Sequence, residues 1–294
     1  MEKVLVLGGS GFVGSNLVRH FSTKHEVFFT YCSTPRSEIH EHPAALQLDI
    51  CDYSAVQTVL PRLMPTVVVH AAGVKDVRAC EANSEWAFDI NAEGSSNVAK
   101  ACREIGAWLI YLSTDLVFGC DRGAYREDEI PTPTTAYGRS KLAGEEMARS
   151  ETDDLTVCRS GGLYGQSSPL LAWVAGELEA GRKIVAFTDV MNTPTYCVNL
   201  AEMLDAVMQR RLTGIFHTTG PARVSRYTLF ATFARTFGHD VQLLEAKAAG
   251  DSRKDLLLQA DASLSGNASA LRLGVARDGI EQGMARLRAE GDIG

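Results

Sequence analysis

The stretch "KVLVLGGSGFVG", residues 3–14, joins an apolar run to four closely spaced glycines. The apolar half predicts a buried strand, and the residues after the glycines begin a helical pattern. The glycines can be read as Gly9-x-Gly11-x-x-Gly14 or as Gly8-x-x-Gly11-x-x-Gly14. The second reading is favoured because Gly8 is the first residue that must turn. A tight glycine turn before a helix amino terminus predicts a pyrophosphate site, and the alternative is a turn without a ligand.

Short apolar runs recur along the first part of the chain and alternate with longer segments of helical period. The further runs are "EVFFTY" (26–31), "ALQLDI" (45–50), "TVVVHAA" (66–72), "WLIYLST" (108–114) and "LTVCRS" (155–160). Nearly continuous apolar strands that alternate with helices predict a doubly wound parallel sheet of the Rossmann type. In such sheets ligands bind beyond the carboxyl ends of the strands, so the residues that follow each run are the candidate site residues.

The alternation becomes less regular after Gly165. We therefore expect a dinucleotide-binding domain over residues 1–165 and a smaller substrate lobe over residues 166–294. The segments "VNLAEMLDAVMQRR" (198–211) and "GIFHTTG" (214–220) have the pattern of one more helix and strand. We expect residues 192–220 to return to the main sheet, so that the division is interleaved.

The composition is that of an ordinary globular protein. The 294 residues are 45% hydrophobic and 22% charged, and the formal net charge is −7. Without a run of basic residues, this balance argues against nucleic acid or an anionic membrane as a partner. The sequence is long enough to bury a sizeable core.

Targeting and metal signals are weak. The amino-terminal residues lack the features of a signal peptide, and no apolar stretch reaches the roughly 18 residues of a membrane span. The seven cysteines are scattered and never spaced C-x-x-C, which favours reduced thiols and a cytoplasmic location. "HEH" at 40–42 lies in a polar segment without a third ligand nearby, so we expect no metal site.

The end of the second strand helps to distinguish the two nicotinamide cofactors. An acidic residue there accepts a hydrogen bond from the 2′-hydroxyl of NAD, whereas a basic residue suits the 2′-phosphate of NADP. Here "FFTYCSTPRS" contains no acid before Glu38. Ser33 and Arg36 are therefore candidates for a phosphate pocket, and NADP(H) is favoured over NAD(H). The alternative for Arg36 is a solvated loop position.

Further candidates follow the third and fourth strands. Asp49 can accept from an adenine amino group, although a helix-capping role for Asp49 or Asp52 is about as well supported. In "HAAG" (70–73) the small residues allow a cofactor to lie close to the backbone, and His70 itself is interpreted as a packed strand residue. Asn91 lies in a helical segment and either carries a hydrogen-bond relay or faces solvent.

The fifth strand ends with Ser113, Thr114 and Asp115, and the segment "PTPTTAYGRSKLAGEE" (131–146) follows with Tyr137 and Lys141. The spacing of four residues puts the phenol and the ammonium on one helical face, although this spacing alone also fits a packed tyrosine and a solvated lysine. Together with the strand-end hydroxyls it predicts a carbonyl reductase. The phenol donates a proton, a hydroxyl holds the oxygen, and the ammonium is expected to lower the phenol's pKa.

The sequence resembles the extended short-chain dehydrogenase/reductases, and within them the dTDP-4-dehydrorhamnose reductase family of sugar-nucleotide reductases. The likeness extends over the glycine turn, "HAAG", "CEANSEWAFDINAEGSSNVAKAC" (80–102), "LSTDLVFG" (112–119), "YREDEIPTPTTAYGRSKLAGEE" (125–146), "RSGGLYG" (159–165), "TPTYCVNLAEML" (193–204) and "GIFHTTGPARVSRYTLFA" (214–231). It implies an NADP-dependent oxidoreductase of carbohydrate biosynthesis that acts on a nucleotide-linked keto sugar, with a homodimer left open.

The resemblance implies that Thr114, Tyr137 and Lys141 form the catalytic set, with Lys141 also holding the nicotinamide ribose. The residues expected to bind the cofactor are Gly8, Gly11, Phe12, Val13, Gly14, Ser33, Arg36, Asp49, Ile50, Ala71, Ala72, Gly73, Asn91, Tyr137 and Lys141. Leu116 stands where sugar-nucleotide 4,6-dehydratases carry a catalytic glutamate, which disfavours dehydration.

The expected substrate lobe departs from the family pattern. The usual Arg-Pro pair appears in "SRKDLLLQAD" (252–261) with Lys254 in place of the proline, and Leu163 and Arg226 replace tryptophans common in the reductases. Asp115, Arg226 and Arg253 are the candidate substrate-binding residues. We expect further donors to a sugar-nucleotide diphosphate among the cations Arg182, Lys183 and Lys254.

Three functions fit the resemblance. The favoured one is an NADP(H)-dependent ketoreductase of a nucleotide-linked keto sugar. The alternatives are a cofactor-binding regulatory subunit, similar to the β subunit of methionine adenosyltransferase, and an epimerase of the same superfamily. The sugar, the nucleotide and the stereochemistry of the product do not follow from the sequence.

Overall fold

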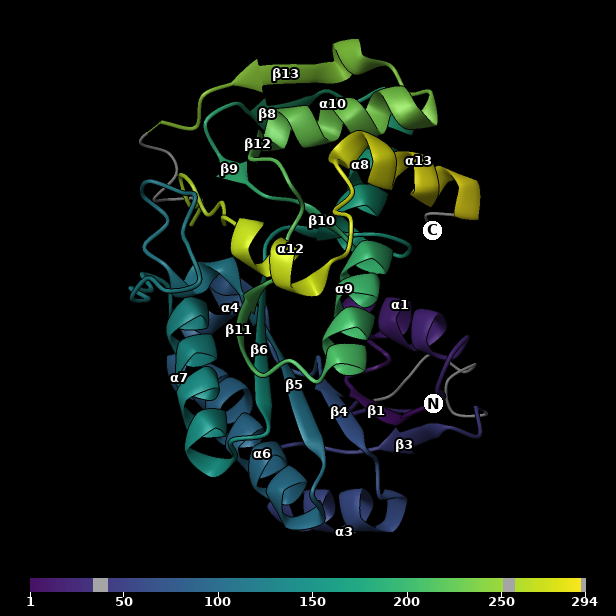
Figure 1. The fold of residues 1–294 in the computed structure, drawn as a ribbon. Helices are drawn as coiled ribbons and strands as arrows, with labels where there is room; N and C mark the ends of the chain where they lie inside the picture. The colour runs from purple at the N-terminus through teal and green to yellow at the C-terminus, as the bar shows by residue number, and fades with distance from the viewer. Residues whose placement is uncertain (34–41, 251–256, 292–294) are drawn as a thin grey trace. The chain divides into compact units, whose positions relative to one another are not determined.

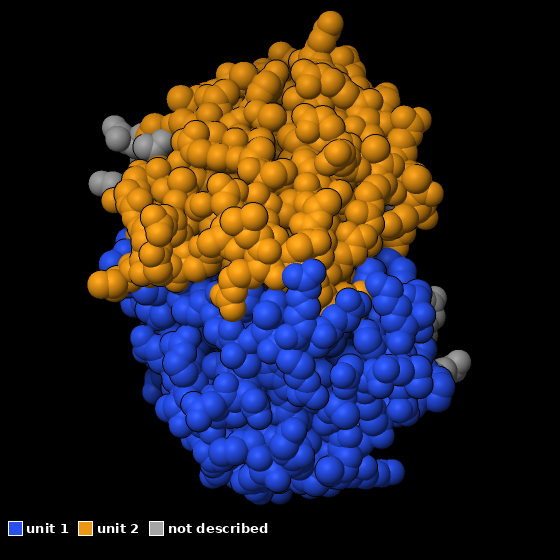
Figure 2. Space-filling model, viewed as in Figure 1, with its two compact units in different colours: residues 1–117, 131–159, 207–216 blue, residues 118–130, 160–206, 217–294 orange. Residues whose placement is uncertain are grey.

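The structure is a computed structural model that describes residues 1–33, 42–250 and 257–291. Its contacts divide the chain into two compact units, coloured separately in Figure 2. The first contains residues 1–117, 131–159 and 207–216, and the second contains residues 118–130, 160–206 and 217–294.

A seven-stranded sheet forms the centre of the first unit (Figure 1), with strand order β11-β6-β5-β4-β1-β2-β3. The strands are β1 (Lys3–Leu7), β2 (Glu26–Tyr31), β3 (Ala45–Gln47), β4 (Val67–His70), β5 (Trp108–Thr114), β6 (Leu155–Ser160) and β11 (Gly214–His217). The pairs β1–β2, β2–β3, β1–β4 and β4–β5 are parallel. The order reverses between β1 and β4, and in doubly wound sheets this reversal marks the ligand crevice.

Helices cover this sheet on both faces. They are α1 (Phe12–Phe21), α3 (Tyr53–Leu63), α4 (Val77–Ala82), α5 (Ser84–Phe88), the π-helix η1 (Asp89–Glu93), α6 (Gly94–Ile105), the 3₁₀ turn η2 (Asp115–Val117) and α7 (Ala136–Glu151). Leu5 and Leu7 of β1 belong to a buried cluster with α3, α6 and α7. Because side chains alternate along a strand, Val4 and Val6 point to the opposite face, where α1 packs. The doubly wound fold is thereby confirmed.

The second unit has its own apolar core, formed chiefly by α8 (Pro169–Glu179), α10 (Arg226–Phe237) and α13 (Ile280–Glu290). Ser225 starts α10 by accepting a hydrogen bond from the Thr228 N–H at 3.0 Å, and Phe230 and Phe233 lie on its buried face. Three small strand pairs complete it: β8 (Ile184–Phe187) with β13 (Leu244–Lys247), β7 (Leu163–Tyr164) with β10 (Thr195–Tyr196), and β9 (Met191–Asn192) with β12 (Val224–Ser225). The remaining elements are α9 (Cys197–Arg210), η3 (Val241–Leu243) and α12 (Asn267–Leu273).

The compact units place the segments somewhat differently from the division expected at residue 165. Residues 118–130 belong to the second unit, and of the segment 192–220 the part 207–216 belongs to the first. Helix α9 continues from one unit into the other. The assignment of cofactor binding to one unit and substrate choice to the other stays a prediction.

Candidate active site

The glycine turn lies between β1 and α1, as the reading that starts at Gly8 requires. Gly8 has φ 75°, and a Cβ there would lie 2.7 Å from the Ala72 Cα, so only glycine fits without displacing the loop after β4. Gly11 is the N-cap residue of α1, and no side chain caps the helix. Since the first turn also lacks acidic residues, the amino end of α1 retains backbone donors suited to an anion.

The residues at the adenosine end are only partly described. Ser33 is exposed directly after β2, whereas Arg36 lies outside the described residues. Asp52 caps α3 by accepting from the Ala55 N–H at 3.1 Å. Asp49 is exposed and accepts from the Cys51 N–H at 2.9 Å, while the neighbouring Ile50 is buried. The helix-capping role therefore falls to Asp52, and the proposed adenine contact of Asp49 stays a prediction.

Asn91 fixes the loop that follows β4. Its side-chain amide donates to the Val74 carbonyl and to Ser140 Oγ, both at 2.9 Å, and its Oδ1 accepts from the Val74 N–H at 2.9 Å. Asn91 lies in η1 and is 1% exposed, so it does not face solvent. Of the two interpretations of this residue, the hydrogen-bond relay therefore remains. Local π-helices are frequent at functional sites. His70 is fully buried, and its Nε2 lies 3.1 Å from Ser95 Oγ.

Helix α7 begins at the residues that carry the predicted chemistry. Thr135 caps it by accepting from the Gly138 N–H at 3.0 Å. Tyr137 is half-buried in the first turn, and Lys141 follows on the same face with 6% of its surface exposed. The spacing therefore places the two side chains as expected, and Lys141 is buried rather than solvated.

Thr114 and Asp115 meet Tyr137 at the carboxyl end of β5. Thr114 is 7% exposed, donates from Oγ1 to Asp115 Oδ1 at 2.8 Å and forms a hydrogen bond with the Tyr137 side chain. Burial raises the pKa of Tyr137, and the Thr114 hydrogen bond only partly opposes this effect. The expectation that Lys141 lowers the phenol's pKa below its ordinary value is thus not met, because the cost of burying a phenolate dominates. The phenol stays protonated, as a proton donor must.

Lys141 lies against an aromatic face. Its Nζ is 4.0 Å from the centroid of the Tyr111 ring. Burial lowers the pKa of Lys141 to about 7, and the Glu145 carboxylate acts in the opposite direction. Burial, helped by the nearby Lys141 ammonium, lowers the pKa of His70 to about 3, so that histidine is neutral. Proton chemistry at this edge of the sheet therefore rests on Tyr137 and Lys141.

A buried ion pair extends this cluster and was not found by sequence reasoning. Glu145 accepts from Arg159 Nε at 3.0 Å and Nη2 at 2.6 Å, and also from Ser113 Oγ. Both charged side chains are nearly inaccessible to solvent, at 1% and 2% exposure. The available signal was the four-residue spacing that continues from Lys141 to Glu145, whereas the contact with Arg159 depends on tertiary structure.

The candidate substrate-binding residues differ in their burial and in their ion pairs. Arg226, the first residue of α10, is half-buried, and burial lowers its pKa. No carboxylate of the described residues pairs with it. Arg182 and Lys183 instead form exposed ion pairs with Glu177 and Glu245, at 2.8 and 3.1 Å, and are poor candidates for a diphosphate site. Arg253 and Lys254 lie outside the described residues.

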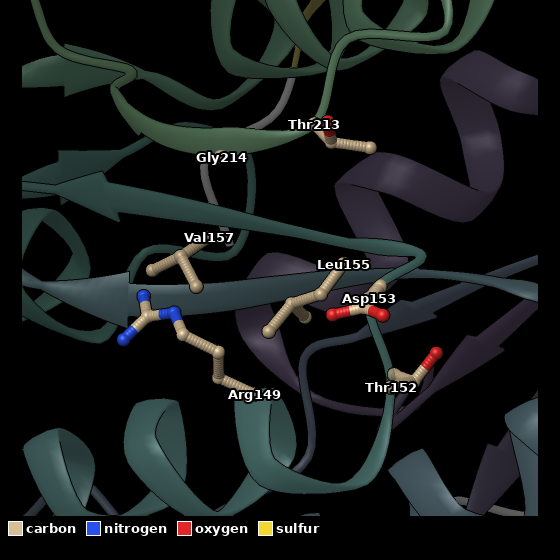
Figure 3. Close-up of a pocket in the computed structure, with 7 residues that line it drawn as sticks. All are labelled: Arg149, Thr152, Asp153, Leu155, Val157, Thr213 and Gly214. Carbon is tan, nitrogen blue, oxygen red and sulfur yellow. The ribbon is translucent and has the colours of Figure 1, made fainter.

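A pocket of about 250 Å³ lies in the first unit, away from these residues. Figure 3 shows Arg149 extending from α7 toward Val157 of β6, with Thr213 and Gly214 on another side. Thr152, Asp153 and Leu155 complete its lining. None of the predicted site residues lines it, so it is not the candidate active site.

Within the described residues no helix has both the length and the apolar character needed to cross a membrane. Within the same part of the chain, no three His, Cys, Asp or Glu residues are grouped so that they could hold a metal ion.

Comparison with known proteins decides the family. Residues 1–288 match the RmlD substrate binding domain family. The chain belongs to this family. It is therefore an oxidoreductase of the extended short-chain dehydrogenase/reductase type, as the sequence resemblance implies.

Individual relatives agree over four fifths of the chain or more. The probable low-salt glycan biosynthesis reductase Agl14 of Haloferax volcanii is 30% identical, over 97% of this chain and 96% of the relative. The dTDP-4-keto-6-deoxy-D-glucose reductase of Streptomyces niveus is 32% identical over 81% and 80%. The dTDP-4-dehydrorhamnose reductase of Bacillus anthracis, solved in complex with NADP, has a TM-score of 0.86 and 25% identity, covering 99% of both chains.

Proposed function

We propose that this chain is an NADPH-dependent ketoreductase of a nucleotide-linked 4-keto sugar. The observation that carries the proposal is the hydrogen bond between Thr114 and Tyr137 at the carboxyl edge of the sheet whose first strand leads into the glycine turn, with buried Lys141 four residues after Tyr137 on the same face of α7. Membership of the RmlD substrate binding domain family and the reductase names of the relatives support the same chemistry.

The residues of the first unit fit a nicotinamide dinucleotide. The uncapped amino end of α1 supplies donors for a pyrophosphate, and small residues at Ala71–Gly73 allow close approach to the backbone. The absence of an acid between Tyr31 and Arg36 favours a 2′-phosphate, which supports NADP(H). When bound, the cofactor supplies the hydride that the carbonyl carbon accepts.

The chain's own groups then handle the oxygen. Tyr137 donates its phenolic proton to the oxygen as the carbonyl is reduced, so that an alcohol forms and the phenol becomes a phenolate. The Thr114 hydroxyl, which donates to Asp115 Oδ1 at 2.8 Å, must turn its one proton to the substrate oxygen to hold that oxygen next to the phenol. The Lys141 ammonium stabilises the phenolate that forms and holds the nicotinamide ribose. The second unit, with Arg226, contributes to the choice of sugar nucleotide.

The test is a screen of dTDP-, UDP- and GDP-linked 4-keto sugars for NADPH oxidation by the purified protein. Turnover of at least one sugar nucleotide that is abolished in Tyr137→Phe supports the proposal. Oxidation that survives in this variant would assign the activity to another group. Cofactor binding without any turnover, together with co-purification of a larger partner, would favour the regulatory-subunit alternative.

A further inference from the structure

Glu145 continues the catalytic face of α7. Tyr137, Lys141 and Glu145 follow at successive four-residue steps, which places them in one row along the helix. The row begins at the hydroxyl of Thr114 and ends at the ion pair with Arg159. All of these residues belong to the first unit.

The environment of Glu145 holds its carboxylate in one place. Arg159 donates to both carboxylate oxygens, and Ser113, the residue before Thr114 on β5, donates to Oε1. A bidentate pair of this kind fixes both position and direction of the carboxylate. Burying two charges is costly, and an apolar pair of similar volume is often as stable. The stability of the fold is therefore a weak explanation for the presence of this buried ion pair. The neighbouring Lys141 suggests a functional explanation.

The groups around Lys141 come from three elements. Tyr111 of β5 offers its ring at 4.0 Å, and its hydroxyl donates to the carbonyls of Asn91 and Lys141 at 3.3 and 3.4 Å. His70 of β4 is neutral because burial and the nearby ammonium lower its pKa. On α7 itself Tyr137 is protonated. Among these described groups Glu145 is the one that brings a negative charge to Lys141.

We propose that Glu145, fixed by Arg159 and Ser113, is a positioning residue that keeps Lys141 in its ammonium form at the pH of catalysis. The role rests on the proposed function, since it is the ammonium that stabilises the Tyr137 phenolate. It is supported by the direction of the electrostatic effect, because burial lowers the pKa of Lys141 and Glu145 raises it. The charge state of Lys141 thus depends on a carboxylate that Arg159 of strand β6 holds in place.

The test removes the pair as a unit. Glu145→Gln alone would leave Arg159 buried without its carboxylate and could prevent folding. The double variant Glu145→Gln/Arg159→Met removes both charges and keeps similar volumes. Glu145→Asp keeps the negative charge, but its side chain is shorter by one methylene group, so the carboxylate is withdrawn from Lys141. This variant tests the effect of the carboxylate on Lys141 if the double variant does not fold.

The primary readout is the titration of Lys141 itself, followed by NMR of the lysine side-chain signals with Lys141→Arg used for assignment. In the double variant we expect the apparent pKa of Lys141 to fall, because of the two charges removed only that of Glu145 acts on the lysine, and in Glu145→Asp by a smaller amount. This measurement needs no substrate, so it is independent of the proposed reductase activity. If a sugar-nucleotide substrate is found, the basic limb of its pH profile should move to lower pH in parallel.

The matched control is the ion pair between Arg103 of α6 and Glu151, the last residue of α7. Its atoms lie 2.8 Å apart, but its side chains are 50% and 26% exposed. The variant Arg103→Met/Glu151→Gln should leave the titration of Lys141 unchanged. An unchanged Lys141 titration in the folded variants of Glu145 would overturn the proposal and reduce the buried pair to a structural element.

Discussion

Gly138 of α7 lies so close to the Leu116 carbonyl that a Cβ on the glycine would overlap the carbonyl oxygen. The contact lies one residue after Tyr137 and two residues after Thr114, so it fixes the distance between the helix and the strand end that carry these groups. The glycine between the predicted catalytic residues is therefore required by packing.

Gly138→Ala should displace the start of α7 and destabilise the protein by about 1–3 kcal/mol, the usual cost of an overpacked site. Gly176 in α8 is the matched control, because a Cβ there meets nothing within 4 Å. Gly176→Ala should stabilise by about 0.5–1 kcal/mol, since alanine favours a helix over glycine. Thermal unfolding monitored by circular dichroism measures both. Equal effects of the two substitutions would refute the packing role.

Tyr137→Phe should retain the fold and the cofactor affinity but lose about 10²- to 10⁴-fold in turnover, because it removes a positioned general acid and little else. Steady-state rates with the best substrate of the screen give the answer. Tyr53→Phe is the control, as that hydroxyl forms hydrogen bonds with Glu104 and Gln57 in an exposed network. Turnover within a few-fold of the wild type would exclude Tyr137 as the acid.

NADPH should bind more tightly than NADH, and Arg36→Ala should remove most of the difference. A charge-assisted hydrogen bond contributes about 1.5–3 kcal/mol, which corresponds to at least an order of magnitude in affinity. Fluorescence titration of both cofactors measures this, with Arg62→Ala on α3 as the control. The phosphate pocket is disproved if NADPH affinity is the same with and without Arg36.

Reduction should depend on pH through Lys141. Since burial lowers the pKa of Lys141 to about 7, its ammonium predominates below that pH and is lost as pH rises through it. If the ammonium is needed, kcat/KM for ketone reduction falls on the alkaline side with an apparent pKa near that value. A pH series at constant ionic strength tests this, and a flat profile up to pH 9 would contradict it.

The sequence predicted the features of the fold and site that are local. The strand runs, the turn at Gly8 and the shared face of Tyr137 and Lys141 follow from periodicity and spacing over a few residues. The pairing of Arg182 with Glu177 was missed, because charge composition does not tell which surface cations are already engaged. The buried partner of Glu145 was missed too, since Arg159 comes from a different element and only packing brings the two together.

The rise in Tyr137 pKa exposes a further limit of sequence reasoning. The order of residues suggested a nearby cation, which favours the phenolate, but it carried no information on how far the hydroxyl is removed from water. Desolvation depends on every neighbour of the group and is the largest contribution here. The chemistry of a site can thus be predicted from residue types before its energetics can.

The last prediction concerns Arg226 in the second unit. Its guanidinium is half-buried, burial lowers its pKa, and it has no carboxylate partner among the described residues, so an anionic ligand would satisfy it. Arg226→Ala should raise the KM for a sugar nucleotide about tenfold or more, because a charge-assisted bond to a phosphate is lost, and should leave cofactor affinity unchanged. Arg182→Ala is the matched control, since that guanidinium is 59% exposed and already paired with Glu177. Steady-state kinetics of both variants with the same substrate decide the question. An equal KM in the two variants would remove Arg226 from the substrate site, and a larger effect on NADPH than on the sugar nucleotide would move it to cofactor binding.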